Sequence, residues 1–153
     1  MNNTLEFLKK GFEFLSKSRL RRAIRNFEFA VRAGDGTNLQ RDVAALMMVE
    51  TAKYRREQKK KRLGNANLFI YDPEDNSGRA WSDVEIAVVL LAPRTRKMTA
   101  FLNRFLKRNS EAIRFQRRYA FGQPLISWKQ ESGERYTRYT QSLKVKGRLG
   151  AVA

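Results

Sequence analysis

The chain of 153 residues contains neither cysteine nor histidine, and these two absences remove most familiar catalytic and metal-binding arrangements. Without cysteine there is no disulfide, no thiolate zinc site and no sulfur nucleophile. Without histidine there is no imidazole to act as a general base, to ligate a metal or to change charge between about pH 5 and 8. An enzyme would need carboxylates with a metal ion, or a serine–lysine pair. We therefore predict a protein that is not an enzyme and that has no metal site and no cofactor.

Long hydrophobic runs are missing too. The longest apolar stretch, Ile86–Ala92, is far shorter than the run of about 18 residues that a membrane-spanning helix needs. The opening letters MNNTLEFLKK lack the basic start and the apolar stretch of a secretory signal. The absence of cysteine agrees with a reducing compartment. We expect a soluble intracellular protein that is cytoplasmic or nuclear.

Acidic residues are scarce relative to basic ones. Fifteen Asp and Glu stand against 32 Lys and Arg, which gives a net charge of +17. Such a charge opposes compaction by self-repulsion, and its usual counterpart is a polyanion. The chain is nevertheless 42% hydrophobic and contains ten Phe, five Tyr and two Trp, so it has the apolar material for one folded core. These numbers favour nucleic acid as the partner, with an anionic membrane surface or an acidic protein as alternatives.

Helical periodicity dominates the first two thirds of the chain. Apolar residues recur at helical spacing through residues 5–15 and 20–31, which predicts a helical hairpin, with Asn3 or Thr4 capping the first helix and Ser18 the second. Capping boxes, in which a Ser or Thr precedes a Glu or Gln by three residues, are expected to start two further helices. Helix starts are also expected at Thr95 or Thr99 and at Asn109 or Ser110. The capping boxes are Thr37 with Gln40 and Ser82 with Glu85.

The remaining segments suggest strands. Residues 67–72 have the aromatic and β-branched density of a short strand. Residues 125–141 alternate around the turn signal ESGE and predict a small β-hairpin. The fold class that follows is mainly α, a compact helical domain over residues 1–142 with an N-terminal helical hairpin and a small C-terminal β-hairpin. An α+β fold is the alternative, and residues 143–153 are expected to form a flexible basic tail.

Two basic segments are the candidate nucleic-acid-binding sites. The first, KYRREQKKKR at residues 53–62, places charge on every face of a continuing helix, so we expect it to project beyond the core. It has two alternative interpretations, a solvated helix end and a nuclear address. The second, residues 94–118, is rich in Arg, whose planar fork suits phosphate. The basic residues expected to contact phosphate are Lys53, Arg55, Arg56, Lys59, Lys60, Lys61, Arg62, Arg94, Arg96, Lys97, Arg104, Lys107, Arg108, Arg114, Arg117 and Arg118.

Aromatic side chains alternate with basic ones near the C-terminus. On a β-hairpin, Trp128 and Tyr136 would stack on unpaired bases while Arg135 and Arg138 hold the backbone. The alternative is that these aromatic rings pack on the helices. Acidic residues gather between residues 72 and 85, and we interpret them as a solvated loop or as internal partners of the basic helices, since their spacing does not match a calcium-binding loop.

The function that this sequence favours is non-enzymatic binding of RNA, single- or double-stranded, through its phosphates and with little sequence preference. Small basic chains without cysteine occur among virus-encoded proteins that package RNA or shield it from host defences, and we expect such a role here. Because one small domain contacts few phosphates, we also expect a homo-oligomer. The alternative is a helical protein-interaction module or a peripheral matrix-like protein, whose basic face would meet acidic host proteins or anionic lipid.

Overall fold

The computed structural model describes residues 2–62, 76, 79–121 and 134–149, and within them it contains seven α-helices and no strand. The prediction of a mainly helical fold is therefore confirmed. The helices are α1 (Asn3–Ser16), α2 (Leu20–Arg32), α3 (Asn38–Arg62), α4 (Asp83–Leu91), α5 (Arg96–Leu106), α6 (Ser110–Phe121) and α8 (Glu134–Leu149).

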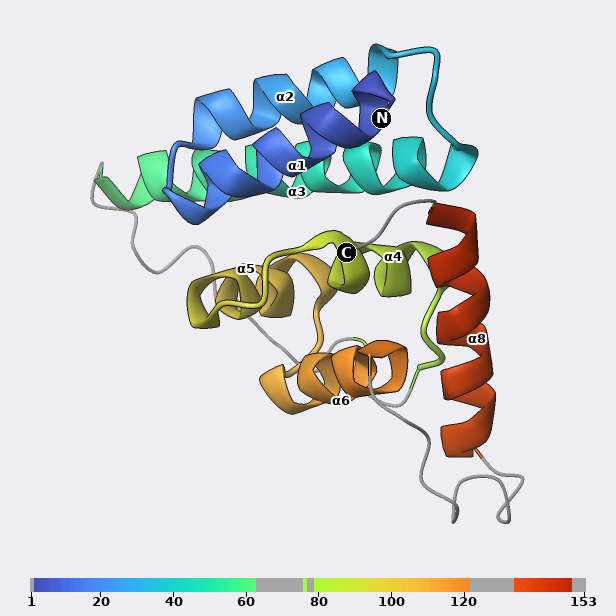
Figure 1. The fold of residues 1–153 in the computed structure, drawn as a ribbon. Coiled ribbons are helices and arrows are strands. Elements are labelled where there is room, and N and C mark those ends of the chain that lie inside the picture. Colours follow the sequence, from blue (N-terminus) through green and yellow to red (C-terminus); the bar gives the residue numbers. More distant parts are fainter. Residues whose placement is uncertain (1, 63–75, 77–78, 122–133, 150–153) are drawn as a thin grey trace.

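Helices α1 and α2 form the predicted hairpin, and α3 runs alongside both to make the upper layer in Figure 1. The two hairpin helices approach closely at Gly11, where a Cβ atom would lie only 2.5 Å from the ring of Phe27. The neighbouring ring of Phe12 meets Phe27 edge to face, with 5.4 Å between centroids. Phe27, Ala23 and Ala30 are fully buried. This hairpin is thus closed by small residues and filled by aromatic ones.

Local hydrogen bonds set the starts of several helices, as the sequence predicts. The Thr37 hydroxyl accepts from the backbone N–H of Gln40, and the Gln40 side chain accepts from the N–H of Thr37, both at 3.1 Å. The same reciprocal box joins Ser82 and Glu85 at the start of α4. Thr95 caps α5. These three predictions are confirmed. The sequence could predict them since each depends on residues only three positions apart.

The start of α1 differs from the prediction and is tied to a distant turn. Asn2, rather than Asn3 or Thr4, is the cap, and its side chain accepts from the N–H of Leu5 at 2.7 Å. Asp35, in the turn after α2, accepts hydrogen bonds from the backbone N–H groups of Asn3 and Thr4 and from the Thr4 hydroxyl. These bonds, that from Asn3 above all, lower the pKa of the Asp35 carboxyl.

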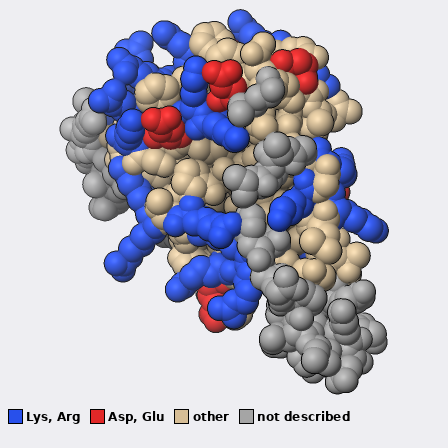
Figure 2. Space-filling view, in the orientation of Figure 1, with Lys and Arg blue, Asp and Glu red and all other residues tan. Residues whose placement is uncertain are grey.

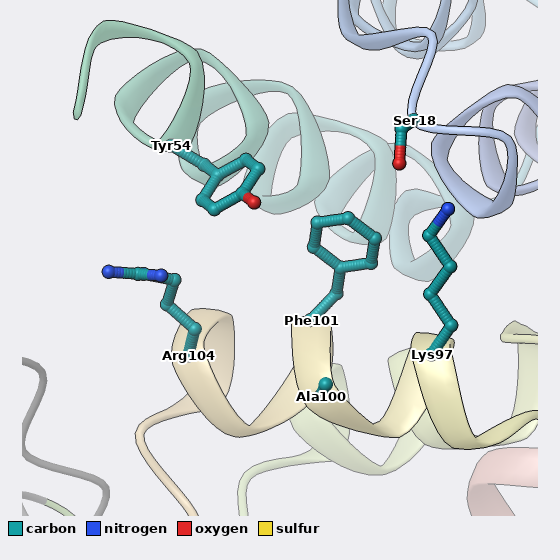
Figure 3. A pocket seen from close by; sticks show the side chains of 6 residues that line it. All are labelled: Ser18, Tyr54, Lys97, Ala100, Phe101 and Arg104. Carbon is teal, nitrogen blue, oxygen red and sulfur yellow. The ribbon is translucent and has the colours of Figure 1, made fainter. Parts of the chain in front are cut away.

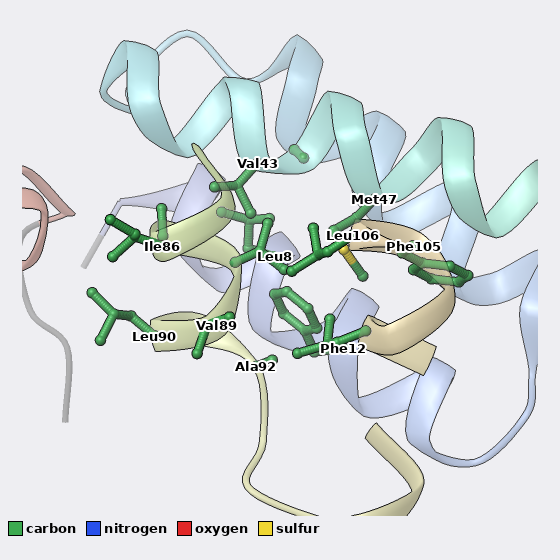
Figure 4. Close-up of a cluster of buried hydrophobic side chains, with 14 of the residues drawn as sticks. Leu8, Phe12, Val43, Met47, Ile86, Val89, Leu90, Ala92, Phe105 and Leu106 are labelled. Carbon is green, nitrogen blue, oxygen red and sulfur yellow. The ribbon is translucent and has the colours of Figure 1, made fainter. Parts of the chain in front are cut away.

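Helix α4 lies at the centre of the molecule, beneath α3, and α8 runs across one end (Figure 1). Residues 86–90 of α4 are all buried, which explains why this short stretch is apolar on every side. Figure 4 shows Leu8 and Phe12 of α1, Met47 of α3 and Leu106 of α5 converging in the same cluster. No helix among the described residues is long and apolar enough to cross a membrane.

The predicted C-terminal β-hairpin is wrong where the structure describes it. Its expected return strand belongs to α8, which packs against α4 and α6. Ser142, Val145 and Leu149 recur at helical spacing and are buried, and this burial overrides the β-like alternation of Tyr and Thr before them. The tail predicted from residue 143 is therefore, as far as Leu149, part of a packed helix. The strand expected at 67–72 and the first strand of the hairpin lie outside the described residues.

Candidate nucleic-acid interface

The C-terminal half of α3 packs against α5 through aromatic side chains. The Tyr54 ring packs edge to face on Phe101, with 5.2 Å between centroids, and also contacts Phe105 at 6.3 Å. Arg104 of α5 lies with its guanidinium 5.2 Å from the centre of the Tyr54 ring and forms an ion pair with Glu57 at 3.2 Å. The two basic segments predicted from sequence are thereby joined into one surface.

Most of the predicted phosphate-binding residues are exposed to solvent on this surface. Beyond the Tyr54 contact, α3 extends past its neighbouring helices, as predicted, and carries exposed cations along its last turns (Figure 1). In the space-filling view, Lys and Arg side chains cover much of the face from the upper helices down to α6, with only isolated acidic side chains among them (Figure 2). The exposed members of the predicted set are Lys53, Arg56, Lys59, Lys60, Arg94, Arg96, Lys97, Lys107, Arg114 and Arg118.

Arg108 is the clear exception, because it is buried and only 5% exposed. Its guanidinium forms a bidentate pair with Glu85, at 3.0 and 3.2 Å. The remaining N–H groups donate to the carbonyl oxygens of Asn76, Arg79 and Ala80 at 2.7–3.0 Å. The guanidinium also lies 4.5 Å from the centre of the Trp81 ring. Since all five donors are used inside the protein, Arg108 has none left for phosphate and is removed from the candidate interface.

Arg117 is half-buried and joins α6 to α5. It donates to the Thr99 hydroxyl at 2.8 Å and to the Pro93 carbonyl at 3.4 Å. Burial first, and then the nearby charge of Arg94, lowers the pKa of Arg117, which still leaves an arginine protonated at neutral pH. Arg117 thus positions α6 beside α5, and the exposed Arg94 lies close to it. Arg55 and Arg104 are also only partly exposed.

The remaining predicted residues lie at the end of α3, outside the described residues, or in α8. Lys61 and Arg62 belong to the last turn of α3, and their side chains are outside the described residues, as is Trp128. Arg135 and Tyr136 lie in α8, so they cannot stack on bases from a β-hairpin. Arg138 is partly exposed on α8, and its carbonyl accepts from the Ser142 hydroxyl at 2.8 Å.

A second cationic group, absent from our sequence-based prediction, flanks the turn between α1 and α2. Ser18 in this turn lines a hollow together with Tyr54 and residues of α5, which brings the start of α2 to the edge of the interface. The letters KSRLRRAIR already carry the signal, but helical periodicity led us to interpret this segment only as a hairpin. The exposed cations of this group are Lys17, Arg19, Arg21, Arg22 and Arg25.

Helix α6 carries an exposed aromatic ring between cations. Phe115 is 41% exposed, and the Arg118 guanidinium lies 5.4 Å from its centre. These two residues, with Arg114 and Glu111, line a shallow groove of about 220 Å³. A ring and guanidinium groups in this arrangement match what an unpaired base and its phosphate require.

The described acidic residues between 72 and 85 pair with cations from distant parts of the chain. Glu85 binds Arg108, and Asp83 forms an ion pair with Arg148 at 2.8 Å and accepts from Gln141 at 2.9 Å. The interpretation of this segment as an internal partner of the basic segments is confirmed for Glu85, whereas the pair between Asp83 and Arg148 is exposed. Within the part of the chain that the structure describes, no three acidic side chains gather closely enough to hold a metal ion.

Comparison with known proteins adds no family to this description. The chain matches no protein-family model, no curated protein and no solved structure. The chemistry of the basic surface is therefore the ground on which a function is proposed.

Proposed function

We propose that this chain is a non-enzymatic RNA-binding protein that holds the phosphate backbone with little sequence preference. The observation that supports this proposal most directly is the joining of α3, α5, α6 and the residues that flank α5 into one surface with ten exposed Lys and Arg. Even if each of the fifteen acidic residues paired with one cation, 17 of the 32 positive charges would remain. A polyanion that releases its counterions on binding is the partner that such a surface suits best.

Weak sequence preference follows from the kind of contact. Phosphate contacts fix the position of a protein on nucleic acid but carry no base information. Binding of this type suits packaging RNA or shielding it, in the cytoplasm or the nucleus, and self-association would extend the row of phosphates that one particle holds. Sedimentation of the protein with and without RNA tests that last point, with a larger particle expected when RNA is present.

Two structural features favour RNA over the alternative of a protein-interaction module or peripheral membrane protein. The apolar residues of α5, Met98, Leu102 and Leu106 among them, lie in the core and are not available as membrane anchors. The alternative would place a partner between α1 and α2, but these helices pack on each other and on α3, and Phe27 and Ala30 of α2 are fully buried. Binding to RNA and to anionic vesicles at matched salt separates the two. Preference for vesicles would favour the alternative.

Matched pairs of lysines test whether the interface is local. Lys59 and Lys107 lie on it, whereas Lys9 of α1 and Lys144 of α8 are also exposed but lie outside the predicted set. Replacing Lys59 and Lys107 with Gln should make the salt dependence of RNA binding shallower by about two units, one for each lost phosphate contact. The Lys9→Gln/Lys144→Gln double variant should change it much less. Equal effects would mean that RNA senses only the net charge and would contradict a localised interface.

A further inference from the structure

A hollow of about 240 Å³ lies where three separate elements of the basic surface meet. Ser18 comes from the α1–α2 turn, Tyr54 from α3, and the other lining residues from α5. In Figure 3 the hydroxyls of Ser18 and Tyr54 both point inward, the Phe101 ring lies between them, and Lys97 stands on one side and Arg104 on the other. The hollow thus combines aromatic surface, hydroxyl groups and positive charge.

Ser18 holds a backbone conformation that normally calls for glycine. Its φ angle is +57°, in the left-handed region, where a side chain is disfavoured. The backbone N–H of Ser18 donates to the Leu15 carbonyl and that of Arg19 to the Phe14 carbonyl, both at 2.9 Å, so the turn closes the end of α1. A glycine would stabilise such a turn better.

The Ser18 side chain does not cap a helix. We predicted from sequence that it caps α2, and this prediction is wrong. The cap position belongs to Arg19, and its side chain makes no capping hydrogen bond. The Ser18 hydroxyl makes no hydrogen bond to any of the described residues. It points instead into the hollow, where it can donate to a ligand (Figure 3).

The α5 side of the hollow is built by residues one helical turn apart. Lys97, Phe101 and Arg104 lie on one face of α5, with the small side chain of Ala100 leaving space between them. Arg104 is held in place by Glu57 and by the Tyr54 ring. The Lys97 side chain is exposed and rises toward Ser18 (Figure 3). A phosphate between Lys97 and Ser18 would leave its base next to the Tyr54 and Phe101 rings.

We propose that this hollow binds one unpaired nucleotide of RNA, with the base against Tyr54 and Phe101 and the phosphate between Lys97 and the Ser18 hydroxyl. The inference rests on the proposed function and names the form of RNA that this part of the surface selects. The volume is below the roughly 300–1,000 Å³ of sites that enclose drug-sized molecules, which suits a single nucleotide. A base inside a duplex is stacked on both faces and must be unstacked first at a cost, so single strands are preferred at this position.

Two substitutions test the hollow without changing the charge of the surface. Ala100→Leu fills the space and keeps a good helix-forming residue at an exposed position. Ser18→Gly removes the hydroxyl and relieves the left-handed backbone. Gly147→Leu is the control, because it adds an apolar side chain at an exposed position of α8 with open space around it. The probes are a labelled oligouridine, which stays single-stranded, and a labelled RNA duplex, with thermal melting of each variant measured alongside.

We expect Ala100→Leu to weaken oligouridine binding by at least about tenfold, the scale of one lost base stack, and to change duplex binding by less than about twofold. Ser18→Gly should weaken oligouridine binding by about two- to tenfold while its melting temperature stays equal or rises. Gly147→Leu should bind both RNAs as the unmodified protein does. Oligouridine affinity unaltered in both hollow variants, or equal losses on both RNAs, would overturn the nucleotide site and leave the proposed function standing. No binding of either RNA by the unmodified protein would refute both.

Discussion

Replacing Arg108 with Gln should lower the free energy of unfolding by about 3–5 kcal/mol, the range for breaking a buried ion pair by removing one partner. Five hydrogen bonds are lost or rearranged, two to Glu85 and three to backbone carbonyls. The Glu85 side chain is only 16% exposed and would lose its cationic partner. Gln is too short and has too few donors to replace the guanidinium, and the contact with the Trp81 ring is lost as well.

Lys107 is the matched control, since it is the adjacent residue, carries the same charge and is exposed. Lys107→Gln should change the free energy of unfolding by no more than about 0.5 kcal/mol, as surface substitutions usually do. Urea denaturation, followed in parallel by Trp fluorescence and far-ultraviolet circular dichroism, measures both variants and checks that the transition is two-state.

The two variants should rank in the opposite order when RNA affinity is measured instead of stability. Under conditions in which both are folded, Lys107→Gln should weaken RNA binding, whereas Arg108→Gln should bind as the unmodified protein does, since Arg108 is buried. An Arg108→Gln variant within about 1 kcal/mol of the unmodified protein that also loses RNA affinity would show that Arg108 serves the ligand and that the structural reasoning is wrong.

Three further predictions concern stability and are read from urea or thermal unfolding. Gly11→Ala, which usually stabilises a helix, should destabilise this one by about 1–3 kcal/mol, because the new Cβ meets the buried Phe27 ring, and a gain in stability would refute the close approach. Asp35 has a lowered pKa in the folded state, so its contribution is present above the ordinary carboxyl value near pH 3.9 and is lost as the pH falls through the lowered folded value. Asp35→Asn should therefore flatten the stability profile in acid, and an unchanged profile would contradict this. Phe105→Ala should cost about 3–5 kcal/mol, and intact stability with lost partner binding would mark α5 as an interface.

Sequence reasoning succeeded where a structure is decided by neighbours in the chain. The boxes at Thr37 and Ser82 and the cap at Thr95 need only residues three positions away. It failed at α8, because alternating Tyr and Thr are compatible with a strand until the burial of Val145 and Leu149 against other helices is known.

The site was predictable as a set of basic segments but not as an arrangement. Nothing near Arg108 in the sequence shows that it will be neutralised, since its partner Glu85 lies 23 residues away and meets it only after α4 and α5 have packed. The role of Ser18 is hidden for a similar reason. Its position beside Lys97 results from tertiary structure, while its residue type suggested an ordinary helix cap.

The salt dependence of RNA affinity tests the proposed phosphate interface most directly. If the surface formed by α3, α5 and α6 neutralises about five to eight phosphates, the logarithm of the binding constant should fall with the logarithm of salt concentration with a slope of about −4 to −7, taking the value for duplex nucleic acid. Affinities for RNAs of different sequence should fall together. A slope close to zero, even with tight binding, would contradict an interface built on phosphate contacts.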